Sequence, residues 1–428
     1  MSVTTDVADT DATDTDTGAP GKGRTARFAL ILGGLTAFGP LSIDMYLPAL
    51  PLMAEDLGST DAVLQLTLAV FLVGLGVGQL VAGPLSDSWG RRGPLLVGVS
   101  IFIMASVLAA ASPSAEVLIA ARAVQALGAA TGMVIARAAV RDLFSGAAMA
   151  RFFSVLMLVV GVAPILAPVI GGQLLEWTSW RGIFVTLTVF GGLLLVVAAL
   201  ALPETLPVAG RRPPRFGRIV RTYRDLLADR VFLGYTVTVG LAFAAMFTYI
   251  SGSSFVLQDL YGLSPGEYSL AFGMNGVGLV IMTQVNGRIV GRFAPRTLLR
   301  TGLTMVTVSA SGAVLAVLAG LGLPGLLTPL FFMVSSVGMI MPNATSLALA
   351  DHPRTAGSAS ALLGVVQFLV GGSASPLVGL LGGDSALPMT MIMAVAAAAA
   401  LTVFLVLTRP RGTPTSPPDR AAADAPVG

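Results

Sequence analysis

The sequence predicts an all-α polytopic membrane protein with twelve transmembrane helices in two six-helix halves. The 428-residue chain is 55% hydrophobic and 11% charged, with a mean hydropathy of +0.85, whereas soluble domains are about one-quarter charged. Twelve stretches contain enough apolar residues, about 20 each, to cross a bilayer. A basic polar segment divides these stretches six and six. Only helices are expected to span, because the open edges of a sheet have no hydrogen-bond partners in lipid.

The predicted spans follow one another along the chain with short polar connections. They cover residues 28–50, 62–82, 94–113, 115–137, 152–175, 182–202, 231–255, 268–290, 298–318, 325–350, 356–381 and 387–408. Residues 1–27 and 409–428 are polar and are predicted to be disordered tails. The first tail lacks the short apolar region and cleavage site of a signal peptide, so we expect the first span to stay in the mature protein.

The polar segment at residues 203–230 is predicted to be a linker between two halves of the molecule. The N-terminal half covers residues 28–202 and the C-terminal half residues 231–408, which are 175 and 178 residues long. Two equal halves joined by a long basic linker are typical of transporters built from parallel repeats.

The basic residues gather on one side of this topology. With both tails in the cytoplasm, 23 of the 25 Lys and Arg residues fall on the cytoplasmic side, as the positive-inside rule requires. We therefore expect a plasma-membrane protein with both termini cytoplasmic, whose arginines are topology signals and not a nucleic-acid footprint. Arg122 and Arg181 do not follow the rule. Arg181 begins the sixth span beside two tryptophans, and we expect it to be a structural anchor.

The scarcity of nucleophiles argues against an enzyme. The chain has no cysteine, one histidine (His352) and one lysine (Lys22). It therefore cannot build a thiolate metal site, and almost no nucleophile–base pair is left to build within the membrane. We expect no cofactor and no metal, with the proton gradient as the energy source. His352 is predicted to be solvated in a cytoplasmic loop.

Asp44 is the only acid well inside a predicted span. It lies 16 residues after Phe28, or about 24 Å along a helix, and Arg122 lies about 9 Å below the outer surface, at a similar depth. An unpaired charge at this depth costs several kcal/mol, so we expect the two side chains to face a shared polar cavity. Burial favours the protonated carboxyl and a guanidinium favours the ionised form. Asp44 is therefore predicted to carry the proton and Arg122 to modulate it, with a static ion pair as the alternative.

The loop "GPLSDSWGRR" at residues 83–92 is predicted to form part of an inner gate. Asp87 is level with the start of the eleventh span, near residues 355–358, and a carboxylate is stabilised at a helix N-terminus. Gly83 and Gly90 are expected to allow tight packing and a turn. The alternative is a plain turn in which Arg91 and Arg92 are only topology signals.

The fifth predicted span contains "GVAPILAPVIGG" at residues 161–172. Pro164 and Pro168 remove two backbone donors and are expected to bend this helix. Gly171 and Gly172 are expected to let a neighbouring helix approach closely.

These motifs resemble those of a known family. "GPLSDSWGRR" resembles the signature between helices 2 and 3 of the major facilitator superfamily. "RAVQALGAATG" at residues 122–132 looks like the helix 4 motif of its proton-coupled members, and the residue 161–172 motif resembles the antiporter motif. "GPLSIDMYLPALP", "LPETL" and "GSASALLGVVQF" resemble the bicyclomycin-resistance (Bcr/CflA) group of drug–proton antiporters.

The resemblance covers residues 28–408 and implies the fold of that superfamily, with roles for Asp44 and Arg122 in proton and drug coupling. Thr36 stands where some broad-specificity relatives carry a second acid. We expect a monomer whose partners are a small-molecule drug, protons and the lipid bilayer. The alternative is a facilitator for a metabolite such as a sugar or an amino acid.

Polar residues within the spans are candidates for lining the substrate cavity, with only a minority expected to touch substrate. They are Tyr46, Gln65, Gln125, Asn275, Gln284, Asn343 and Gln367. With one buried acid and one buried arginine, the cavity is predicted to take neutral or zwitterionic, phenicol- or bicyclomycin-like compounds. A lipophilic dication is expected to be excluded.

Overall fold

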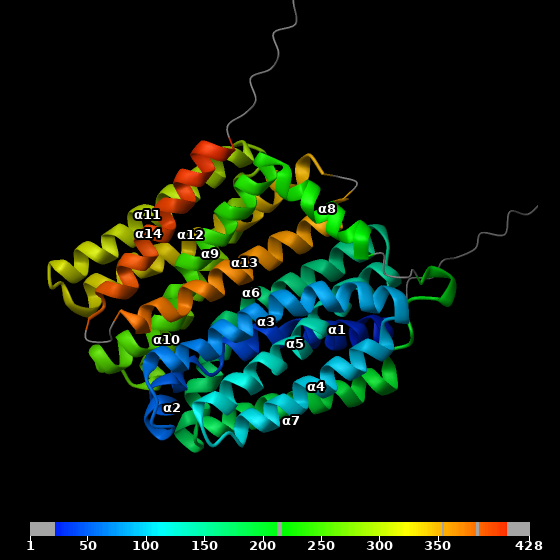
Figure 1. The fold of residues 1–428 in the computed structure, drawn as a ribbon, viewed down its shortest axis with the longest axis horizontal. Helices are drawn as coiled ribbons and strands as arrows, with labels where there is room; N and C mark the ends of the chain where they lie inside the picture. Colours follow the sequence, from blue (N-terminus) through cyan, green and yellow to red (C-terminus); the bar gives the residue numbers. More distant parts are fainter. Residues whose placement is uncertain (1–21, 212–215, 353–354, 382–384, 409–428) are drawn as a thin grey trace, which may run out of the picture.

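The computed structural model describes residues 22–211, 216–352, 355–381 and 385–408, which form helices and their connections (Figure 1). The helices are α1 (Lys22–Asp44), η1 (Leu47–Ala49), α2 (Leu50–Asp56), α3 (Asp61–Trp89), α4 (Arg92–Ala110), α5 (Ala115–Leu143), α6 (Gly146–Trp177), α7 (Trp180–Ala201), η2 (Val208–Gly210), α8 (Phe216–Ala228), α9 (Arg230–Phe255), η3 (Val256–Leu260), α10 (Pro265–Ile289), α11 (Pro295–Leu318), α12 (Gly322–Ala350), α13 (Ala356–Leu380) and α14 (Leu387–Leu407).

The prediction of twelve spans is confirmed. In the described part of the chain, twelve helical stretches are long and apolar enough to cross a membrane. The first is built from α1, η1 and α2 and covers Arg27–Asp56, and the seventh joins α9 to η3 and covers Arg230–Leu260.

The helices form two groups that lie side by side (Figure 1). Helices α1–α7 lie in one group and α9–α14 in the other. The main contacts between the groups pair α3 with α13 and α6 with α10. These four helices therefore frame whatever space lies between the halves.

Local sequence explains where several helices begin. The Thr60 side chain accepts a hydrogen bond from the N–H of Val63 and caps α3. At α10, Ser264 and Glu267 form a capping box in which each side chain accepts from the other's backbone N–H. Such caps satisfy donors that the first helical turn leaves unpaired.

The first span breaks immediately after Asp44 because of two prolines. Pro48 and Pro51 have no N–H to offer to the carbonyl groups four residues earlier. The chain passes through the short helix η1 before α2 begins. Ser254 Oγ, from the other half, donates to the Leu47 carbonyl oxygen at 2.6 Å. The break thus turns backbone acceptors toward partners outside the helix.

The linker contains a helix that the sequence analysis did not predict. Helix α8 crosses the end of the bundle and contacts α9 and α13 (Figure 1). Leu226 is buried, whereas Val220 and Leu227 on the same helix are exposed. Helix α8 is therefore packed against the C-terminal half.

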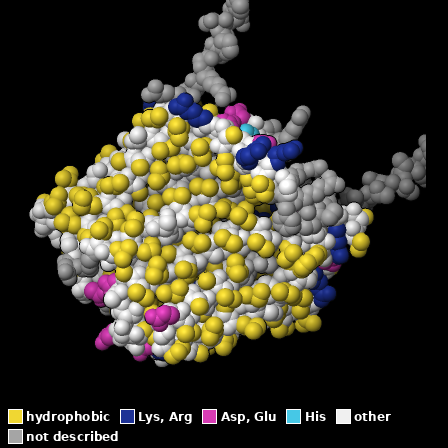
Figure 2. Space-filling view, viewed as in Figure 1, with side chains coloured by type: hydrophobic (Ala, Val, Ile, Leu, Met, Phe, Trp, Pro, Cys, Tyr) yellow, Lys and Arg dark blue, Asp and Glu magenta, His cyan; other side chains and the backbone are white. Residues whose placement is uncertain are grey.

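Charged side chains lie at the two ends of the bundle, and the Lys and Arg side chains visible in this view gather at one end, together with some acids (Figure 2). We call the end that carries Arg91, Arg92, Arg141, Arg230 and Arg296 the basic end. The opposite end, which we call the acidic end, carries Glu55, Asp56, Asp61, Glu116, Asp259 and Glu267. Yellow hydrophobic side chains cover most of the surface between them, as expected for a surface that faces lipid.

Candidate functional site

A cavity of about 190 Å³ lies between the two halves. Its walls come from both halves and are mostly apolar. The residues that line it are Gly39, Pro40, Ile43, Asp44, Leu75, Met133, Val160, Pro164, Phe243, Met246, Phe247, Tyr249, Ile250, Phe272, Asn275, Gly276, Leu279, Val334, Gln367 and Phe368. Concave, largely apolar sites with a few polar groups are the usual form of a small-molecule site.

Asp44 is the one charged residue in this lining. It is the last residue of α1, and only 4% of its surface is exposed. Among the described residues, no hydrogen bond or ion pair to its carboxyl group is present. Nearby in the wall, Asn275 Nδ2 donates to Tyr249 Oη at 2.6 Å. Asp44 therefore faces the cavity as an unpaired acid.

The expectation that Arg122 shares this cavity with Asp44 is wrong, and so is the alternative of a static ion pair. Arg122 is fully buried within the N-terminal half. Its Nη1 donates to Gln125 Oε1 at 2.6 Å and its Nη2 to the Ser42 carbonyl oxygen at 2.8 Å.

Aromatic rings complete the surroundings of the Arg122 guanidinium. Its central carbon lies 4.4 Å from the ring centre of Tyr46 and 4.1 Å from that of Phe71. Such rings stabilise a cation through their negative faces. Because the break in α1 supplies a carbonyl acceptor and these rings are adjacent, the guanidinium is held without a carboxylate.

Of the polar candidates, Asn275 and Gln367 line the cavity. The prediction is wrong for Gln284, whose side chain is exposed, and for four others that bond elsewhere. Tyr46 Oη lies 3.2 Å from Thr67 Oγ1, Gln65 Oε1 accepts from the Gly379 N–H at 3.0 Å, Gln125 Nε2 donates to Ser106 Oγ at 2.7 Å, and Asn343 Nδ2 donates to Asn286 Oδ1 at 2.6 Å.

The sequence analysis missed the aromatic wall of the cavity. Phe243 and Phe247 lie one turn apart on α9, and Tyr249 stacks on Phe272 of α10 with ring centres 5.5 Å apart. Phe368 adds a ring from α13. The i, i+4 spacing of aromatic residues on α9 was a signal for this surface, but in an apolar span it also fits ordinary packing.

The halves are sealed together at the acidic end. Ser254 and Gln258 of the C-terminal half donate to the Leu47 and Pro48 carbonyl oxygens of the N-terminal half, at 2.6 and 3.2 Å. Gln65 accepts from the backbone of α13. This end of the cavity is therefore closed.

The contact between α3 and α13 loosens toward the basic end. A Cβ added at Gly379 or Gly372 of α13 would lie 2.4 or 3.1 Å from atoms of α3, whereas one at Gly364 would have only Gln79 Oε1 within 4 Å, at 3.6 Å. A Cβ added at Gly83, Gly287 or Gly357 would meet no atom within 4 Å. The expectation of tight packing at Gly83 is thus wrong, because α3 has no close neighbour there. A bundle closed at one end and parted at the other is one of the two end states expected of alternating access.

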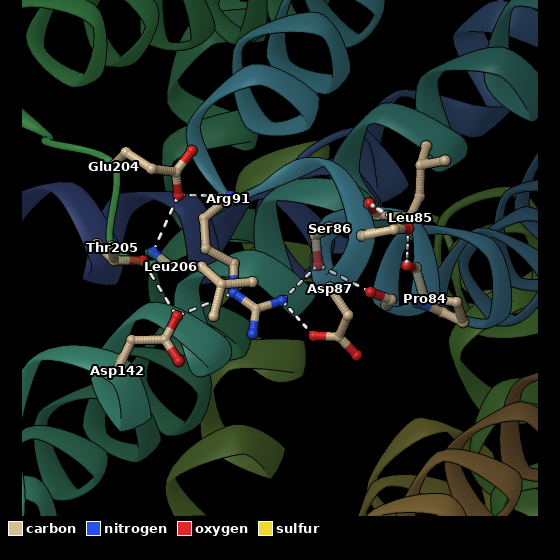
Figure 3. Close-up of polar contacts among 11 residues, drawn as sticks. Pro84, Leu85, Ser86, Asp87, Arg91, Asp142, Glu204, Thr205 and Leu206 are labelled. Carbon is tan, nitrogen blue, oxygen red and sulfur yellow. Dashed lines mark hydrogen bonds and ion pairs between the residues drawn. The ribbon is translucent and has the colours of Figure 1, made fainter. Parts of the chain in front are cut away.

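The loop between α3 and α4 is a closed polar network (Figure 3). Arg91 Nε donates to Asp142 Oδ2 at 2.9 Å, and Arg91 Nη1 contacts Ser86 Oγ and Asp87 Oδ1 at 2.8 and 2.5 Å. The Arg91 N–H donates to Glu204 Oε1 at 2.7 Å. These bonds join α3, α4 and α5 to the start of the linker.

Gly90 makes the turn in this loop. Its φ is +93°, and an added Cβ would lie 2.4 Å from Glu204 Oε2. Burial raises the pKa of Glu204, but the N–H groups of Arg91, Leu206 and Arg92, together with the charge of Arg211, lower it, and the net direction is downward. Arg92 also donates from Nη2 to the Ala199 carbonyl oxygen at 2.6 Å. Both arginines thus have structural partners.

The predicted contact between Asp87 and the start of α13 is not present in this conformation. The Asp87 side chain is 57% exposed and pairs with Arg91. Because the bundle is parted at this end, the acid has no partner across the gap.

The α6 motif lies against both α1 and α10. Pro164 lines the cavity. A Cβ added at Gly171 would lie 1.8 Å from the Met45 carbonyl oxygen, and one at Gly172 would lie 2.5 Å from Ser269 Oγ. Pro168 is within the same helix. The glycine pair thus allows α6 to touch the break in α1 and the opposite half at once.

Two remaining charged residues have local partners. Arg181 Nη1 pairs with Asp56 Oδ2 at 2.6 Å and its guanidinium lies over the Trp180 ring at 4.1 Å. The expectation that His352 is simply solvated is wrong, because its Nε2 lies 3.2 Å from Asp229 Oδ2 and its side chain is only 19% exposed.

Comparison with known proteins supports a transporter. The profile of the Major Facilitator Superfamily matches residues 32–376. The chain is 42% identical to the uncharacterized MFS-type transporter YdgK of Bacillus subtilis, covering 91% of this chain and 97% of that protein. It is 31% identical to a bicyclomycin resistance protein homolog of Haemophilus influenzae, with 89% and 96% covered. The solved D-xylose–proton symporter shares the fold, with a TM-score of 0.70 at 15% identity over 90% of this chain and 98% of that one.

Proposed function

Because the chain belongs to the major facilitator superfamily, we propose that it is a drug–proton antiporter. In this proposal it expels small neutral or zwitterionic compounds, such as phenicols or bicyclomycin, across the plasma membrane in exchange for protons. The relative from Haemophilus influenzae, named for bicyclomycin resistance, supports this class of substrate.

The single observation that carries the proposal is the place of Asp44. It is the only charged group in the lining of a cavity built from both halves. Taking up a proton removes the charge and releasing it restores the charge, so each step changes the free energy of the cavity. Protonation of Asp44 can shift the balance between two conformations only if the surroundings of its carboxyl group differ between them. An acid at the interface of two halves that rock against each other meets this condition.

In the proposed topology the basic end faces the cytoplasm and the acidic end faces outward. The described conformation is then inward-facing. A substrate enters from the cytoplasm, the halves rock about the cavity, and protonation of Asp44 from outside returns the empty protein.

The cavity chemistry supports neutral or zwitterionic substrates. One carboxylate among mostly apolar walls can offset one positive charge, but a permanent dication would leave a second charge unpaired at a cost of several kcal/mol. The Arg122 guanidinium is held by the carbonyl group of Ser42, two residues before Asp44, and does not line the cavity.

A susceptibility panel in a host that lacks its own efflux pumps tests the proposal. Expression should raise resistance to chloramphenicol, florfenicol or bicyclomycin, and adding one of these to inverted vesicles should release protons. Resistance to dicationic dyes without resistance to any of these three drugs would contradict the substrate class. Substrate flux with no proton movement would instead indicate a facilitator.

A further inference from the structure

Arg137 of α5 is a cation without a counterion near the central cavity. Its Nε donates to the Met133 carbonyl oxygen at 3.2 Å and its Nη2 to Gln79 Oε1 of α3 at 3.4 Å. In the described part of the chain it forms no ion pair with a carboxylate. Its side chain is partly exposed.

Gln79 presents a second donor at the same place. Its Nε2 is buried and has no hydrogen-bond partner among the described residues. A Cβ added at Gly364 of α13 would lie 3.6 Å from Gln79 Oε1. An unpartnered buried amide donor is costly, and here it lies beside a guanidinium at the boundary between the halves.

Both residues lie just below the cavity on its basic side. Leu75 and Met133 line the cavity, and Gln79 and Arg137 each follow by four residues on helices that run toward the basic end. Four residues are about 6 Å along a helix. A ligand that enters from the basic end therefore passes these donors before it reaches the aromatic wall.

We propose that Arg137 and Gln79 form a subsite for a planar two-oxygen acceptor of the substrate, a carboxylate or a nitro group. This inference rests on the proposed function and names the part of the substrate that is recognised. A guanidinium offers parallel N–H donors whose geometry fits two oxygens.

The spacing from Asp44 suits a zwitterion. A Cβ at Gly39 would lie 2.7 Å from Met133 Sδ, so these two residues are level. Asp44 is five residues from Gly39 toward the acidic end, and Arg137 is four residues from Met133 toward the basic end. The backbone positions of Asp44 and Arg137 are thus separated by roughly 13 Å along the bundle, and the charged groups lie somewhat closer because the Arg137 side chain turns back to the Met133 carbonyl oxygen. A substrate with an amine at one end and a carboxylate at the other fits this order of charges.

The chain has no cysteine, so Gly364→Cys introduces a single thiol next to Gln79 Oε1 and leaves both Gln79 and Arg137 in place. Purified full-length protein carrying this change is treated with matched thiosulfonate reagents, one an anionic sulfonate and one a trimethylammonium cation. The measured quantity is the ratio of the labelling rate with the anionic reagent to the labelling rate with the cationic reagent. This ratio should be at least about fivefold higher with Arg137 present than in the Arg137→Gln background. Arg141→Gln, an exposed arginine one turn further along α5, is the matched control and should leave the ratio unchanged.

Protection by ligands then tests recognition. The zwitterion norfloxacin should slow the labelling of the Gly364→Cys thiol, and its methyl ester should not. Arg137→Gln should abolish this difference, while Arg137→Lys should keep part of it. An unchanged reagent ratio, equal protection by acid and ester, or no protection by either would overturn the subsite. Drug-driven proton release by the unsubstituted protein is measured in parallel, so failure of the antiporter proposal is seen separately from failure of the subsite.

Discussion

Asp44→Asn should uncouple transport from the proton gradient. The substitution nearly preserves side-chain volume, and Asp44 makes no bond to the described residues that it would break. Asn cannot gain or lose a proton, so the variant should insert and bind substrate but lack a proton carrier. Among the described residues that line the cavity, no other is charged and could replace it.

The expected size of the effect follows from one titratable group in the cavity. Moving one charge through 100 mV is worth about 2.3 kcal/mol, which sustains roughly a 50-fold gradient of a neutral substrate. For one proton exchanged per substrate, the parent should reach about this ratio for each 100 mV of proton-motive force. The variant should only equilibrate substrate across the membrane.

Inverted vesicles give the assay. A pH-sensitive dye reports proton release on drug addition, and exchange of labelled for unlabelled drug without a gradient reports binding and rocking. Asp44→Asn should lose the first signal and keep the second. The matched control is Asp225→Asn, an acid on α8 with a 64% exposed side chain, which should behave like the parent. Undiminished drug-driven proton release by Asp44→Asn would refute the assignment of the proton carrier.

Three further outcomes are expected. Gly171→Ala places a methyl group 1.8 Å from the Met45 carbonyl oxygen, and because that neighbour is backbone we expect a loss of about 3 kcal/mol or more; an unchanged melting temperature in detergent would contradict this. Asp87→Asn should weaken the inner gate, so spin-label distances across the basic ends of α3 and α13 should lengthen on average, and no widening counts against the gate. Glu204→Gln should reduce the free energy of unfolding at pH 7 by about 1 kcal/mol through weaker bonds to the Arg91 loop, measured as a lower melting temperature. Since the folded-state pKa of Glu204 is below the ordinary 4.5, its contribution is present above 4.5 and is lost as the pH falls through the folded value, so a difference that persists at lower pH would speak against this role.

The spans were predictable because length and hydropathy decide them. Asp44 was identifiable for a similar reason, since an acid deep in an apolar stretch stands alone. The linker helix α8 was missed, although Tyr223 and Leu226 in "FGRIVRTYRDLLA" have the three-residue spacing of one face of an amphipathic helix. A polar composition hid this pattern.

The surroundings of Arg122 were not predictable from its depth. Depth along a helix places a residue at a level in the membrane, but it does not say which partner the side chain finds. The decisive partner is the Ser42 carbonyl oxygen, close to a break in α1 whose geometry depends on Pro48 and Pro51. Polar residues such as Gln65 were wrongly assigned to the cavity for a related reason. A side-chain amide in a span can form a hydrogen bond between packed helices as readily as it can line a cavity.

The seal at the acidic end has a consequence for the medium in which the protein works. The described bonds across this seal join uncharged groups, namely Ser254, Gln258 and Gln65 with backbone partners of the other half. Dissolved ions screen charges and leave such neutral bonds almost untouched. The opposite end holds exposed ionic groups such as Asp87 and Arg92. One pair of charges does meet across the seal, since Asp61 and Asp259, from opposite halves, repel each other. In the proposed orientation, external salt should therefore act on this end only by screening that repulsion, which favours the closed seal.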